Sequence, residues 1–222
     1  MKKLELFVIL LIVLTLSIGC KTGGVMEYQK NENNPQIVVK ELNSPSSVLT
    51  ISIPDEMTAD VSPKDEPVKG EMEPYITNKG SIYPAHGVYE IKSTDENFPY
   101  IIRIEYVCFD KEKIENETGQ SFTPSIDGAA EYYSNSMKES SKSGSKATQN
   151  LDINISNISV DGKDARLINS SFKNNGYPVI NKSIYVVDNN GILWLVSFNC
   201  NGKDKNVSNK VDKVIETIKF SK

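Results

Sequence analysis

Hydrophobic and polar residues alternate along much of the chain after residue 48, and this pattern predicts β-strands. The first segment, residues 49–53, reads Leu-Thr-Ile-Ser-Ile and ends at Pro54, which indicates a half-buried strand. Residues 82–92 and 100–109 follow as a pair of strands. In the second of the pair, apolar residues share one face and charged residues lie on the other: Ile102, Ile104, Tyr106 and Cys108 against Arg103 and Glu105.

Strong turn signals continue the strand pattern after residue 150. Asp161-Gly162 and Asn190-Gly191 are dipeptides that favour two-residue hairpin turns. The strands that they would connect are 153–160, 165–172, 184–187 and 192–198. The last of these is apolar on both faces, which predicts a strand in a sheet that is covered on both sides.

Two segments instead have the period of an amphipathic helix. Thr123 is a candidate N-cap, Pro124 suits the first helical position, and the helix would end near Gly144. Its apolar stripe is Ile126, Ala129, Ala130, Tyr133 and Met137. A second helix is expected at about 205–219, with the stripe Val207, Val211, Val214, Ile215 and Ile218 covering the sheet face of either Trp194 or Leu195. Together these elements predict the α+β class, with an antiparallel β-sheet covered by helices.

The first twenty residues have the layout of an export signal. Lys2 and Lys3 precede an apolar run over residues 6–16, which is shorter than the ~20 residues of a membrane span. Because Cys20 directly follows Gly19, the segment resembles a bacterial lipoprotein signal, in which that cysteine is acylated. The resemblance implies cleavage after Gly19 and lipid attachment at Cys20. An ordinary cleaved signal and an uncleaved N-terminal anchor are the alternatives.

This interpretation divides the chain into a signal peptide (1–19), a flexible tether (20–44) and a single α+β domain (45–222). The tether is polar and rich in asparagine, and only Ile37-Val38-Val39 within it resembles a strand. A Pro-rich acidic insertion at 54–80 interrupts the domain. Loops of that length are uncommon unless they are functional or disordered, so the insertion is a candidate binding element.

Net charge and cysteine content limit the partners and the cellular location that the chain can have. The 222-residue chain has a net charge of −4 and no basic cluster, which argues against nucleic acid and against electrostatic adhesion to anionic lipid. Two acyl chains on Cys20 would supply stable membrane attachment instead. Lys21 and the Lys-, Asn- and Ile-rich composition favour a Gram-positive cell membrane. Cys108 and Cys200 could form a disulfide in an exported protein, or remain two free, buried thiols.

The C-terminal two-thirds of the chain resembles the PsbP-like family, the α/β/α sandwich of the photosystem II extrinsic protein and of a Ran-binding nuclear import factor. The segments that carry the resemblance are 51–54, 129–137, 158–165, 193–196 and 218–220. The resemblance implies a non-enzymatic adaptor or assembly factor, and several bacterial members are lipoproteins. The acidic insertion stands where the family often has an aromatic-rich segment, so no ligand residues are carried over.

Few residues of the sequence are candidates for catalysis, metal binding or ligand recognition. His86 is the single histidine, so a zinc site is not expected, and neither a cofactor nor a metal is predicted. Cys108 and Cys200 have the parity of core-facing residues. The acidic residues of the insertion lack EF-hand spacing: Asp60, Asp65, Glu66, Glu71 and Glu73. Tyrosines near the insertion could line a recognition surface or be ordinary half-buried sheet residues: Tyr75, Tyr83, Tyr89 and Tyr100.

These observations predict a membrane-anchored extracytoplasmic lipoprotein that acts as a non-catalytic binding or adaptor domain. Its partners would be the membrane, through the N-terminal lipid, and an unidentified protein or small molecule. The alternatives are an extracytoplasmic enzyme using Cys108, His86 or acidic insertion residues, and a structural envelope protein.

Overall fold

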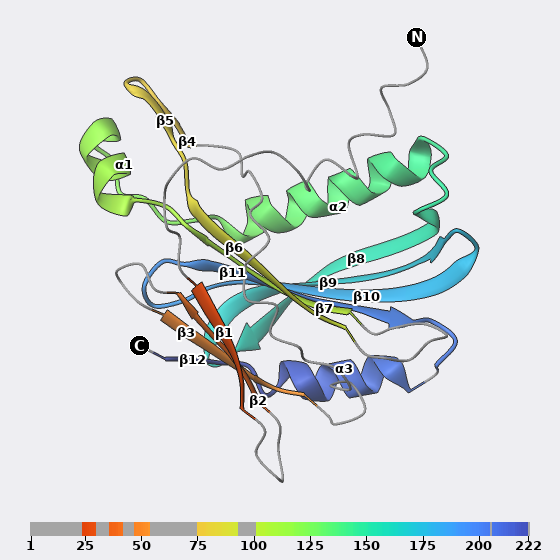
Figure 1. The fold of residues 1–222 in the computed structure, drawn as a ribbon. Helices are drawn as coiled ribbons and strands as arrows, with labels where there is room; N and C mark the ends of the chain where they lie inside the picture. The colour runs from red at the N-terminus through yellow and green to blue at the C-terminus, as the bar shows by residue number, and fades with distance from the viewer. Residues whose placement is uncertain are drawn as a thin grey trace.

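A six-stranded antiparallel sheet forms the centre of the protein (Figure 1). The computed structural model describes residues 24–29, 36–41, 47–53, 75–92, 101–204 and 206–221. The strand order in the sheet is β6-β7-β11-β10-β9-β8. The strands are β6 (Ala85–Lys92), β7 (Ile101–Cys108), β8 (Gln149–Val160), β9 (Lys163–Asn174), β10 (Tyr177–Val187) and β11 (Leu193–Asn201).

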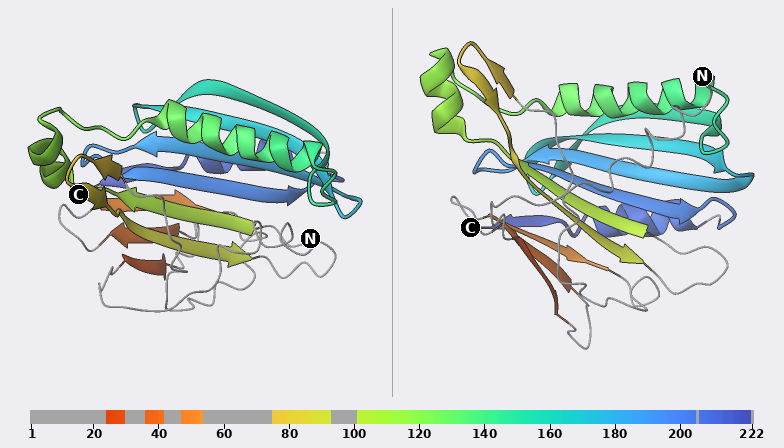
Figure 2. Two further views of the ribbon diagram at one scale, coloured as in Figure 1. Left: turned by 90° about the horizontal axis from the view of Figure 1, so that it is seen from above. Right: turned by 45° about the horizontal axis from the view of Figure 1, so that its top comes forward.

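Helices cover both faces of this sheet, which confirms the predicted α+β class. Helix α2 (Ile126–Lys142) lies on one face, and helix α3 (Val207–Ile215) lies on the other (Figures 1 and 2). On the α3 side the core also includes a second sheet, of order β1-β2-β3-β12. Its strands are β1 (Gly24–Gln29), β2 (Gln36–Glu41), β3 (Ser47–Ser52) and β12 (Lys219–Ser221).

Strand β11 is covered on both faces, as its sequence predicts. Trp194, Val196 and Phe198 belong to the core that α3 closes. Leu193 and Leu195 pack on the opposite side, in the cluster that includes α2 residues. The expected apolar stripe of α3 therefore covers the Trp194 face, and its buried residues are Val207, Val211, Val214 and Ile215.

Tight turns fix the long hairpins of the sheet. Asp161 and Gly162 have φ of 50° and 74°, so both residues of the β8–β9 turn adopt the left-handed region that a type I′ turn requires. Asn175 and Gly176, with φ of 51° and 87°, make the same turn between β9 and β10. The first of these hairpins is the predicted one. The second lies at a further Asn-Gly signal and extends the expected strand 184–187 back to Tyr177.

The part of the chain expected to be a tether contains two strands. β1 and β2 fall within residues 20–44, and β2 pairs along the whole of β3. The expected tether carried a strand hint at Ile37–Val39, which β2 confirms, whereas β1 is a strand that the sequence did not predict. The polar composition did not predict these strands, because β2 is stabilised by backbone hydrogen bonds to β3, a segment outside residues 20–44.

Further differences lie at element boundaries. The end of the predicted insertion forms a hairpin of β4 (Tyr75–Thr77) and β5 (Gly80–Ile82), and its remainder, 54–74, lies outside the described residues. Helix α1 (Lys111–Thr118) was missed because Ile114 is its one buried residue. Helix α2 is capped by Ser125, whose Oγ accepts from the Gly128 N–H at 3.0 Å, rather than by Thr123.

The strand register excludes a disulfide between Cys108 and Cys200. Strands β7 and β11 are antiparallel, with Ile101 opposite Asn199 and Val107 opposite Leu193. The two cysteines therefore lie at opposite ends of the pair, about 26 Å apart at 3.3 Å per residue. A disulfide needs Cα atoms within about 7 Å, so the two cysteines are not bridged. The alternative of two unbridged cysteines is the correct one.

Of the helices in the described ranges, none combines the length and the apolar character needed to span a membrane. The signal segment 1–19 and Cys20 lie outside the described residues.

Candidate functional site

A strip of polar side chains crosses the α2-facing side of the sheet, where strands β6, β7, β11 and β10 lie side by side. Register places Glu105 opposite Leu195, and Arg103 opposite Ser197, so these residues share the face of the α2 cluster. Ser183 lies opposite Ser197 on the next strand. Side chains alternate between the two faces of a strand, so Ile102, Ile104 and Tyr106 are buried on the α3 side of the sheet and the polar residues of β7 lie on the α2 side.

The first part of the strip is charged. Arg103 Nε lies 2.5 Å from Glu105 Oε1, and His86 Nε2 lies 3.3 Å from Glu105 Oε2. Arg103 Nη1 is also 3.9 Å from Glu90 Oε1 on β6. With 5% and 14% of their side chains exposed, His86 and Glu105 form a largely buried pair that Arg103 flanks. The carboxylate of Glu105 therefore joins β6 to β7 through side chains as well as through the strand ladder.

Opposing effects set the pKa of Glu105. Burial by itself raises the pKa of this carboxyl group, but its hydrogen bond with His86 and the positive charge of Arg103 together lower the pKa below its usual value. The ionised form is thus the one that the folded protein stabilises.

The second part of the strip consists of hydroxyl and amide groups. Ser183 Oγ donates to Asn181 Oδ1 at 2.9 Å and lies 2.8 Å from Ser197 Oγ. Asn181 Nδ2 donates to Asn199 Oδ1 at 2.9 Å. Tyr133 of α2 reaches the same Asn181 Oδ1 at 3.5 Å, and its burial raises the pKa of the phenol. The network ties α2 to β10 and β11 and leaves its members neutral and hydrogen-bonded.

The two parts do not combine into a catalytic triad. Ser197 is opposite Arg103, whereas His86 is opposite Val107, four residues further along β7. That offset is about 13 Å at 3.3 Å per residue, far beyond the ~3 Å reach of a general base. The serine hydroxyls are therefore positioned for structure or recognition, and the imidazole has no hydroxyl nucleophile in this strip.

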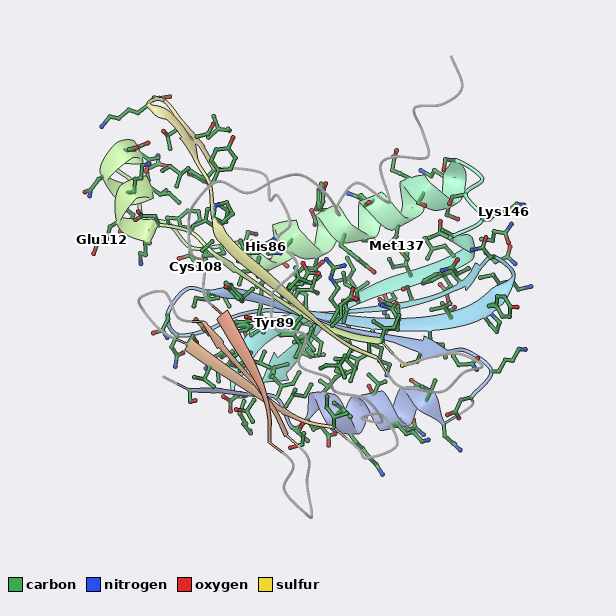
Figure 3. All side chains as sticks on the ribbon, in the orientation of Figure 1. His86, Tyr89, Cys108, Glu112, Met137 and Lys146 are labelled. Atoms are coloured by element: carbon green, nitrogen blue, oxygen red, sulfur yellow. The ribbon has the colours of Figure 1, made fainter. Side chains whose placement is uncertain are left out.

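The cysteines likewise lack the predicted base. Cys108 is opposite Ala85 and His86 is opposite Val107, so the thiol and the imidazole point to opposite faces of the sheet although their strands are neighbours (Figure 3). Cys200 is 1% exposed, and burial raises the pKa of its thiol to about 12. The raised pKa of the Cys200 thiol is the opposite of what a nucleophilic cysteine requires, and the Cys108 thiol lies on the other face of the sheet from the His86 imidazole.

The tyrosines near the insertion do not gather into one surface. Tyr89 is in the core and its ring lies 6.5 Å from that of Tyr106. Tyr75 packs edge-on against Phe122 at 5.1 Å, in the projecting arm formed by β4, β5 and α1. Tyr83 is 70% exposed. Tyr89 therefore fits the alternative of an ordinary sheet residue, a recognition surface stays a hypothesis for Tyr75 and Tyr83, and Tyr100 lies outside the described residues.

A second candidate is a shallow polar depression where α2 ends against the β9–β10 turn. Its volume is about 500 Å³, and it is lined by Ser141, Gly144, Ser145, Gln149, Asn150, Lys173 and Gly176. A bulge in β8 between Gln149 and Asp152 shapes one wall. Neutral donors and acceptors with one lysine suit a small polar ligand. The sequence offered no signal for it, because its lining comes from three separate turns.

Metal binding has no support in the described ranges. Among these residues there is no group of three or more His, Cys, Asp or Glu side chains that could hold an ion. The acidic residues of the insertion, from Asp60 to Glu73, lie outside them.

Solved structures that are similar to this chain include an envelope protein and a protein of unknown function. No family model and no curated protein matches the chain. LpqN of Mycobacterium tuberculosis, described as involved in cell envelope biogenesis, matches with a TM-score of 0.44 and 11% identity over 84% of this chain and 91% of LpqN. PA94 of Pseudomonas aeruginosa, a protein of unknown function described as a candidate regulator, matches with a TM-score of 0.37 and 10% identity over 67% of this chain and 96% of its own. The PsbP-like resemblance remains a prediction.

We expect the Glu105→Gln variant to be less stable than the wild type at pH 7 and equally stable at low pH. Because the folded state lowers the pKa of Glu105, the ionised group stabilises the fold above its unfolded pKa, near 4.5, and that contribution is lost as pH falls through the lower folded value. Urea unfolding of both proteins between pH 7 and pH 3 measures the difference. A gap that stays constant over this range would contradict the assignment.

Proposed function

We propose that this protein is a lipid-anchored extracytoplasmic domain that binds a protein or small-molecule partner and performs no catalysis. The observation that carries the proposal is the N-terminal sequence, in which a charged head and an apolar run lead to Gly19-Cys20. Two acyl chains on Cys20 would hold the protein at the cell membrane, since one chain gives only marginal binding. A Gram-positive envelope fits the lysine at position 21.

The arrangement of reactive side chains supports a binding role. The imidazole of His86 is engaged by Glu105, and Cys108 lies on the other face of the sheet. Buried hydroxyls and amides are paired with one another in the strip on β10 and β11. These are the features of a rigid scaffold, on which the insertion at 54–80 and the arm of β4, β5 and α1 would contact the partner. A net charge of −4 agrees with a partner other than nucleic acid.

We expect the Cys20→Ser variant to lose lipid labelling and to leave the membrane fraction. Cells expressing the full chain would be fed an alkyne-tagged palmitate, and the protein would then be isolated and its label quantified. The matched control is Cys108→Ser, which removes a half-buried thiol and should retain full labelling and membrane association. Undiminished label in the Cys20→Ser protein would refute the anchor.

The binding role needs its own experiment. Crosslinking in intact cells, followed by purification of the wild-type chain, should return one specific partner. The same purification from cells that express a variant lacking residues 75–82 should return less of it. A partner that is recovered equally from both would show that the arm is not the contact surface.

A further inference from the structure

Strand β8 forms an open edge of the central sheet. It is the last strand in the order β6-β7-β11-β10-β9-β8, it is 12 residues long, and in the described parts of the chain its sole strand partner is β9. Helix α2 lies over the face of the sheet (Figures 1 and 2), and no described strand pairs with the side of β8 away from β9. Such an edge is a template for another strand.

The turn at Asp161-Gly162 determines which backbone groups point outward. In a two-residue hairpin the residues that flank the turn, Val160 and Lys163, form a hydrogen-bonded pair. Bonded and non-bonded pairs then alternate along an antiparallel ladder. The even-numbered residues from 152 to 160 therefore bond to β9. The N–H and C=O groups that face the open edge belong to Ile153, Ile155, Asn157 and Ser159.

From Ile153 to Val160 the open edge has none of the usual protection against pairing, because the bulge of β8 lies outside this stretch, between Gln149 and Asp152. Residues 153–160 contain no charged side chain and no proline, which are the features that normally block an edge strand. Asn154, Asn157 and Ser159 are exposed, and the isoleucines between them are half-buried. A charge near the middle of the strand would repel the same charge in a second copy, and this strand has none.

We propose that β8 pairs with β8 of a second copy of this chain, antiparallel and related by a two-fold axis at Ser156. In this register Ile155 is opposite the partner's Asn157, Ile153 is opposite the partner's Ser159, and Ser156 is opposite itself. The four outward-facing residues of each copy then form hydrogen-bonded pairs, and the two central sheets join into one of twelve strands. Asp152, the charged residue of β8, meets the uncharged Val160.

The neighbouring helices leave room for this pairing. Helix α2 contacts β8, β9 and β10, so it is centred near β9. Across the two-fold axis, β9 and its copy are separated by three strand spacings, or about 14 Å. A helix with its side chains is about 10–12 Å wide, so the two copies of α2 fit side by side on the same face.

Cysteine crosslinking of the full-length protein in native membranes tests the register. Ser156→Cys places two thiols at a non-hydrogen-bonded pair, where Cα atoms are about 4.5 Å apart, and a mild oxidant should convert most of the protein to a covalent dimer. Asn154→Cys is the matched control, because position 154 is exposed on the same strand but about 13 Å from its own copy. Equal crosslinking of both variants, or none with Ser156→Cys, would overturn the proposal.

A charge variant tests the same surface without cysteine chemistry. Asn157→Lys brings two like charges close to the axis while leaving the bonds to β9 intact, so the dimer dissociation constant should rise at least about tenfold with the thermal midpoint unchanged. Sedimentation of the detergent-solubilised full chain measures it. A wild-type chain that stays monomeric at ~0.1 mM, or Ser156→Cys that crosslinks to a different protein, would show that the edge has no self-pairing role.

Discussion

Replacing Asp188 with alanine is expected to lower the free energy of unfolding by about 4 kcal/mol. Asp188 is buried and closes the β10–β11 connection. Its Oδ1 accepts from the backbone N–H groups of Asn190 at 2.8 Å and Ile192 at 3.0 Å. Its Oδ2 accepts from Trp194 Nε1 at 2.9 Å and from the Ser47 hydroxyl. Alanine would leave these buried donors without an acceptor, at about 1–3 kcal/mol for each one that water cannot reach.

Two matched variants separate the contributions of Asp188. Asp188→Asn keeps the size of the side chain but replaces one acceptor oxygen by an NH₂ group, so about half of the loss is expected. Ser47→Ala removes one donor together with its need for an acceptor, and should cost only about 1 kcal/mol. Urea unfolding at pH 7 measures all three proteins. Equal stability of Asp188→Ala and the wild type would show that the connection is held by its backbone alone.

Replacing Gly87 with alanine is expected to destabilise the protein by about 3 kcal/mol. Gly87 on β6 is directly opposite Tyr106 on β7, and the Tyr106 ring lies over it. A Cβ atom at Gly87 would be 2.4 Å from Tyr106 Cε1, which is far inside van der Waals contact. The ring cannot move aside because it is 0% exposed and packs against Trp194 at a centroid distance of 5.8 Å.

A double-mutant cycle checks that the clash is the cause. Tyr106→Leu shortens the side chain, so Gly87→Ala in that background should cost less than about 1 kcal/mol. Thermal or urea unfolding of the two single variants and the double variant gives the coupling energy. If Gly87→Ala costs the same in both backgrounds, the loss arises from the backbone of β6 rather than from the tyrosine ring.

Both predictions concern the core on the α3 side of the sheet, whereas the polar strip lies on the α2 side. The α3 side therefore holds the larger apolar core together with the buried Asp188, whereas the α2 side holds a smaller apolar cluster and the polar strip. Phe220 of β12 completes the packed face through its contact with Trp194 at 6.1 Å. A rigid sheet of this kind is a suitable base for the projecting arm and for an edge strand that pairs with a second copy.

The sequence by itself determined the fold class, the presence of β8, β9, β10 and β11, the two larger helices and the buried faces of β7 and β11. These features follow from side-chain period and turn chemistry, which depend on neighbours close in the chain. It also carries the resemblance to a lipoprotein signal, on which the proposed function rests.

Tertiary structure decided everything that depends on register between distant segments. It separated Cys108 from Cys200, put His86 and Cys108 on opposite faces, and assembled the polar strip from four strands. It also recruited β1, β2 and β12, because these segments gain their hydrogen bonds from a ladder that another part of the chain provides. The sequence around a strand does not show which distant segment will pair with it. The core residues could therefore be predicted from the sequence, whereas the candidate site could not.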